Sequence, residues 1–79
     1  MQTTNADKHV LCVIIKTLVA TGVDDDEAVV RATAAIEDAL PLFHAEFARA
    51  LGGSNDPRQA LAAMRAATTA VEAWARENG

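Results

Sequence analysis

The sequence predicts an all-α protein, a three-helix antiparallel bundle with a long second helix kinked at a proline. Apolar residues recur at steps of three and four, as on one face of an amphipathic helix. Glycines and capping residues divide the chain into three segments with helix start and stop signals. The 79 residues include eighteen alanines, the strongest helix formers. Because so short a chain has room for one hydrophobic core, residues 1–79 are expected to form a single domain.

The first helix is expected over about residues 5–21. Thr4 and Asp7 resemble a capping box at its start, and Gly22 provides the left-handed residue that commonly ends a helix. Its apolar residues cover roughly 240° of the helix circumference, whereas an ordinary surface helix needs a stripe of about 100°. A strand is the alternative for this short, β-branched apolar run.

A helix that is apolar over so wide an arc needs neighbours on two sides. We therefore expect a homodimer in which the first helices pack against each other. The predicted interface residues are Leu11, Ile14, Ile15 and Leu18.

The second helix is expected over residues 25–51, ending at Gly52 and Gly53. Four consecutive acids at its start form a D-x-x-E cap and place negative charge where the helix dipole favours it. An acidic docking patch for a basic partner is the alternative role of these acids, which are Asp24, Asp25, Asp26 and Glu27. The predicted inner face of this helix comprises Val29, Thr33, Ile36, Leu40, Phe43, Phe47 and Leu51.

Pro41 lies in the middle of that apolar stripe. Proline removes one backbone hydrogen bond and crowds the preceding turn, so the helix must either kink or break near residue 41. The stripe keeps its phase past Pro41, which favours a kink. A bend here would place Pro41 and Phe43 on a partner surface or beside a pocket.

The third helix is expected over residues 57–77. Asp56 is the expected cap, Pro57 takes the first helical position, and Gln59 completes a D-x-x-Q box. Glu72 and Arg76 form an outward-facing pair four residues apart. The predicted inner face comprises Leu61, Met64, Ala67, Thr68, Val71, Trp74 and Ala75.

Motifs for catalysis or metal binding are incomplete. His44 and Glu46 match half of the zinc deaminase signature, but its paired cysteines cannot exist in a chain with one cysteine. His9 and Cys12 stand three residues apart, and two ligands do not close a zinc site. We expect Cys12 to be a buried apolar side chain, and we predict no catalytic residue, metal or cofactor.

Charge and composition narrow the partner classes. The net charge of −4 and the scattered lysines and arginines argue against nucleic acid. The apolar run near the N-terminus is interrupted by Lys16 and is too short to span a bilayer, so neither a signal peptide nor a membrane anchor is expected. The lone cysteine fits a reducing compartment, and we predict a cytoplasmic location.

These exclusions favour a non-catalytic protein that binds another protein. The expected class is the small bacterial or phage accessory protein, such as an inhibitor, antitoxin, immunity protein or adaptor. A small-molecule binder or carrier, with a pocket beside the kinked helix, is the alternative. An enzyme that uses His9, Cys12 or His44 is the third hypothesis.

Overall fold

The computed structural model describes residues 5–78, and every regular element within that range is a helix. Helix α1 spans Asn5–Ala20, α2 spans Asp25–Leu51 and α3 spans Pro57–Asn78. The prediction of an all-helical bundle is confirmed, and the strand alternative for the first segment is wrong. The predicted cap Thr4 lies outside the described residues.

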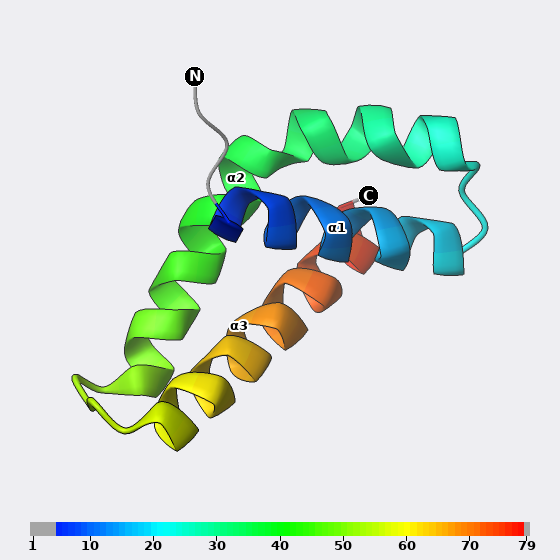
Figure 1. The fold of residues 1–79 in the computed structure, drawn as a ribbon. Coiled ribbons are helices and arrows are strands. Elements are labelled where there is room, and N and C mark those ends of the chain that lie inside the picture. Colours follow the sequence, from blue (N-terminus) through cyan, green and yellow to red (C-terminus); the bar gives the residue numbers. More distant parts are fainter. Residues whose placement is uncertain (1–4, 79) are drawn as a thin grey trace.

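The three helices meet through the long middle helix. In Figure 1 the ribbon of α2 changes direction part-way along its length. Its first half lies beside α1, and its second half lies beside α3. The C-terminal end of α3 crosses close to α1, so all three helices pack together near this crossing.

The turn between α1 and α2 is a Schellman ending. Gly22 has φ 101°, its backbone N–H donates to the carbonyl oxygen of Val19 at 3.0 Å, and Val23 donates to that of Leu18 at 3.0 Å. These are the two hydrogen bonds that define the motif. Glycine is needed here because a side chain disfavours this left-handed backbone.

The turn between α2 and α3 contains the predicted cap at Asp56, whose Oδ1 accepts a hydrogen bond from the backbone N–H of Arg58 at 3.0 Å. Gln59 does not close the predicted capping box. The Asp56 N–H donates to Ser54 Oγ at 3.1 Å, and the Gln59 Nε2 donates to the carbonyl oxygen of Ala50 at 2.8 Å. The glutamine therefore ties the start of α3 to the end of α2.

Alanine supplies much of the core. Six of the eleven buried apolar residues in the described range are alanines, namely Ala28, Ala32, Ala39, Ala63, Ala67 and Ala75. Such small side chains let two helices pack closely. The larger apolar side chains next to them then lie at the edge of the contact between the helices. The predicted inner faces are corrected accordingly, because Val29 is 47% exposed, Leu61 54% and Met64 40%.

The wide apolar arc of α1 is covered largely within the chain. Ile14 and Leu18 are 1% and 2% exposed, while Leu11 and Ile15 are half-buried against the same core. Helices α2 and α3 are the neighbours on two sides that this arc requires. Of the four residues predicted to join two copies, Ile14 and Leu18 are thus core residues of one chain.

None of the described helices combines the length and the apolarity needed to cross a membrane.

Candidate binding pocket

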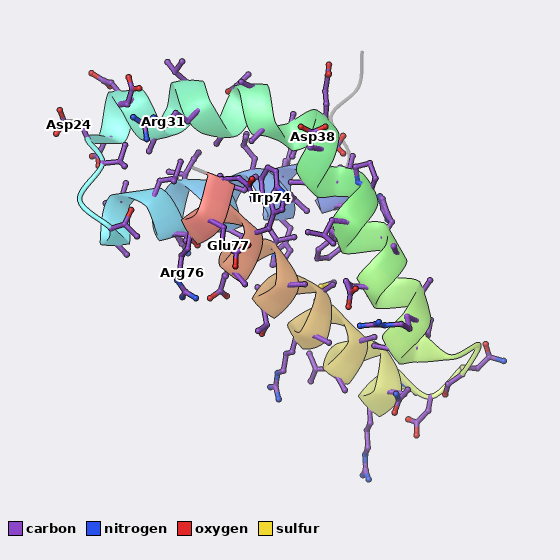
Figure 2. All side chains as sticks on the ribbon, turned by 180° about the vertical axis from the view of Figure 1, so that it is seen from behind. Asp24, Arg31, Asp38, Trp74, Arg76 and Glu77 are labelled. Carbon is purple, nitrogen blue, oxygen red and sulfur yellow. The ribbon has the colours of Figure 1, made fainter. Side chains whose placement is uncertain are left out.

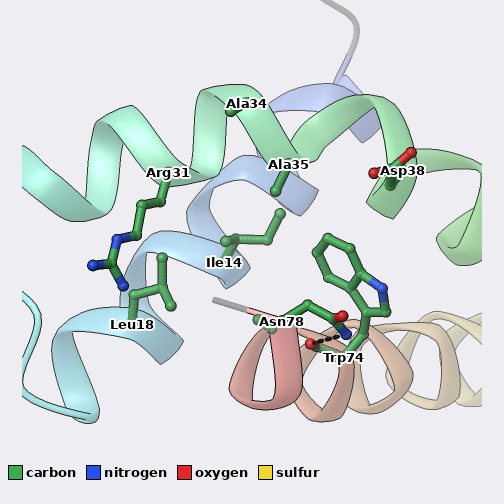
Figure 3. Close-up of a pocket in the computed structure, with 9 residues that line it drawn as sticks. Ile14, Leu18, Arg31, Ala34, Ala35, Asp38, Trp74 and Asn78 are labelled. Carbon is green, nitrogen blue, oxygen red and sulfur yellow. Dashed lines mark hydrogen bonds between the residues drawn. The ribbon is translucent and has the colours of Figure 1, made fainter.

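The strongest candidate site is a pocket where the three helices meet. Its volume is about 410 Å³, and Figure 3 shows Trp74 standing beside Ile14 and Ala35. The half-buried indole of Trp74 forms one wall, and buried side chains of α1 form the floor. The lining residues are Ile14, Leu18, Arg31, Ala34, Ala35, Asp38, Trp74, Ala75 and Asn78.

Each element contributes through helical spacing. Ile14 and Leu18 are one turn apart on α1, and Ala34, Ala35 and Asp38 share one side of α2. The last turn of α3 closes the pocket, where the Asn78 side-chain Nδ2 donates to the carbonyl oxygen of Trp74 at 3.0 Å. This side-chain hydrogen bond holds Asn78 against the turn that carries Trp74.

Two opposite charges stand at the two sides of the pocket. Arg31 lies on one side and Asp38 on the other, with Ile14 and Trp74 between them (Figure 3). The Arg31 Nε donates to Glu27 Oε1 at 3.0 Å, so its charge is balanced on its own helix. No ion pair joins Asp38 to another residue in the range 5–78. Buried apolar side chains thus form the floor of the pocket, and the carboxylate at its rim has no ion-pair partner among residues 5–78.

No protein family model matches this chain. No curated protein and no solved structure is significantly similar to it either.

The predicted acidic patch lines a second, shallow hollow of about 740 Å³ at the α1–α2 turn. Its walls are the four acids at residues 24–27 together with Val19, Gly22 and Val23. All four acids are exposed. Asp24 is the N-cap by position, but its side chain makes no capping hydrogen bond, so part of the acidic run lacks the structural role expected of it.

The predicted partner residues Pro41 and Phe43 occupy different environments. Pro41 is exposed within α2. Phe43 is 4% exposed, and its ring lies 5.6 Å from that of His9 and 6.4 Å from that of Phe47 between centroids. Phe43 is consequently a core residue whose side chain is not accessible to a partner.

The residues considered for metal binding or catalysis are dispersed. The His9 ring makes a 2.9 Å hydrogen bond between its Nε2 and Thr68 Oγ1, whereas the Cys12 side chain is exposed, so the prediction of a buried cysteine is wrong. His44 is also exposed. Within residues 5–78 no group of three or more histidine, cysteine or acidic side chains is arranged to hold a metal ion.

The sequence predicts Trp74 on the inner face of its helix, and no pattern in it indicates Arg31 or Asp38 as site residues. The pocket forms from three separate helices, and no local spacing encodes that meeting. One signal is present in the sequence. Trp74 is the only tryptophan of the chain, and a large aromatic side chain among alanines has few neighbours large enough to enclose it.

Proposed function

We propose that this protein acts by binding another protein, taking an apolar side chain of its partner into the pocket around Trp74. The observation that supports this most is the half-buried indole above an apolar floor, with charge at the rim. Tryptophans in such positions contribute a large part of the binding energy at protein interfaces. The role is non-catalytic, of the inhibitor, antitoxin, immunity or adaptor type expected of a cytoplasmic bacterial or phage accessory protein.

The proposal is tested by blocking the pocket while keeping its floor intact. Ala34 is exposed and lines the pocket, so Ala34→Phe places a ring at its mouth. Ala45 is an exposed alanine of the same helix outside the pocket, and Ala45→Phe is the matched control. A partner captured from host extract by the wild-type protein should be lost with Ala34→Phe and retained with Ala45→Phe. Equal capture by all three proteins would contradict the proposal.

Small-molecule binding is the second candidate, because about 410 Å³ falls within the usual range of ligand pockets. Native mass spectrometry of protein purified from its host tests this function. A bound small molecule should be present on the wild type and on Ala45→Phe, and absent from Ala34→Phe.

We attribute the change of direction in α2 to Pro41, and we take the helices to be packed antiparallel in sequence order. Asp38 is at the corner of the ribbon in Figure 2, three residues before Pro41. Proline disturbs the turn that precedes it, which matches this location. The corner encloses the side of α2 that lines the pocket, so the proline contributes to the pocket's shape.

We also propose that the protein self-associates. Because Ile14 and Leu18 are buried within one chain, a homodimer would use the exposed apolar side chains instead. Leu61 and Met64 are three residues apart on α3 and so lie on one side of that helix. They are the residues we assign to contact between two copies.

A further inference from the structure

The negative charge of the molecule is concentrated on the helix that forms one side of the pocket. Residues 24–38 contain six acids and one arginine, while the whole chain has a net charge of −4. The remaining residues are thus slightly positive in sum. A partner that approaches the pocket along the first half of α2 meets a negative potential, which attracts positive charge and slows the approach of negative charge.

The pocket itself also favours a positively charged group, at shorter range. In Figure 3 the carboxylate of Asp38 lies on the same side of the pocket as the indole of Trp74. A lysine or arginine side chain can lay its aliphatic stem on an apolar surface and keep its charged end in water. The face of an indole and a nearby carboxylate both attract that charged end. The guanidinium of Arg31 repels an approaching positive charge only weakly, because Glu27 balances its charge.

We infer that the pocket recognises a basic amphipathic segment of a partner protein. One apolar side chain of that segment packs against Trp74 and Ile14, and a lysine or arginine on the same side of the segment lies beside Asp38. The acids at residues 24–27 attract further basic residues at one end of the segment. This inference rests on the proposed protein-binding function and specifies the chemistry of the partner.

The experiment uses the fluorescence of Trp74, which reports on the pocket directly because the chain has no other tryptophan. The probe is a synthetic amphipathic peptide of leucine and lysine, roughly four helical turns long and without tryptophan. A leucine–glutamate peptide with the same pattern is the control for charge. The leucine–lysine peptide should change the emission of Trp74 in a saturable way, and the leucine–glutamate peptide should not.

Matched variants separate the contribution of the Asp38 carboxylate from that of general electrostatic attraction. Asp38→Asn should weaken binding of the leucine–lysine peptide about fivefold, as expected for one charge-assisted contact at a rim. Glu37→Gln removes the same charge from the neighbouring residue, which does not line the pocket, and should weaken it less than twofold. Equal weakening by the two variants overturns the inference, since attraction would then be unspecific.

Failure of this inference can be distinguished from failure of the proposed function. If the leucine–glutamate peptide binds as tightly as the leucine–lysine peptide and Ala34→Phe prevents both, the pocket binds proteins but does not select basic segments. If neither peptide changes the emission of Trp74, the inference is overturned, and the capture experiment with Ala34→Phe still decides the proposed function independently.

Discussion

Individual residues at the helix ends differ in what they contribute, although the sequence makes them look alike. Asp56 caps α3 with a 3.0 Å hydrogen bond, whereas Asp24 at the start of α2 makes no capping hydrogen bond. Asp56→Ala should lower the free energy of unfolding by about 1 kcal/mol, because the Arg58 N–H loses its acceptor. Asp24→Ala should lower it by only a few tenths of a kcal/mol, the share left to the helix dipole. Urea denaturation measures both, and equal losses would contradict this assignment.

Thr68 makes a hydrogen bond between separate helices, to the His9 ring on α1. Thr68→Val keeps the shape of the side chain and leaves the histidine nitrogen without this partner, so it should cost about 1 kcal/mol of stability. Among the residues that the structure describes, the Thr69 hydroxyl donates only to the carbonyl oxygen of Arg65 on its own helix, at 3.0 Å. Thr69→Val should change stability by less than about 0.5 kcal/mol. A larger effect at Thr69 than at Thr68 would mean that the interhelical bond does not stabilise the fold.

At the scale of the helix, Pro41 is the most informative position. Pro41→Ala restores an N–H donor to the Glu37 carbonyl, so the melting temperature should stay equal or rise. A straighter α2 should also change the pocket at its corner, and the emission of Trp74 should shift. Weaker binding of the partner is expected in the same variant. A lower melting temperature with unchanged emission and unchanged binding would show that the bend has only a packing role.

The ends of the helices were more predictable from sequence than their inner faces. Gly22 and Asp56 act through contacts with residues a few positions away, so their effect is encoded locally. Which side of a helix faces inward depends on how closely the axes approach, and here Ala28 and Ala63 are buried while Val29 and Leu61 are exposed. A prediction that turns the largest apolar side chains inward therefore selects the wrong residues at these positions. The pocket depended on the crossing of three helices, which no single segment specifies.

At the scale of the whole molecule, large apolar side chains remain exposed on two helices. Val29 on α2 is 47% exposed, and Leu61 and Met64 on α3 are 54% and 40% exposed. The packing of one chain leaves these side chains uncovered. Those on α3 offer apolar surface to the proposed second copy.

Light scattering at micromolar concentration should give the mass of a dimer rather than about 8 kDa. Leu61→Glu should shift the dimer toward the monomer, because the substitution places charge in the assigned contact of α3. Val30 is 65% exposed on α2, outside this contact, and Val30→Glu is the control that should leave the dimer intact. A wild-type monomer would remove self-association from the proposal.

The alanines between the helices have a consequence for how this protein can change over evolutionary time. Replacing a buried leucine or phenylalanine by a smaller residue leaves a cavity, but a buried alanine has only a methyl group to lose. A larger side chain at Ala32 or Ala67, both 0% exposed, would instead push two helices apart. The chain should therefore accept loss of volume at these contacts more readily than gain. Its pocket, bordered by the exposed Ala34 and the half-buried Ala35, is where added volume can be accommodated and where new specificity can arise.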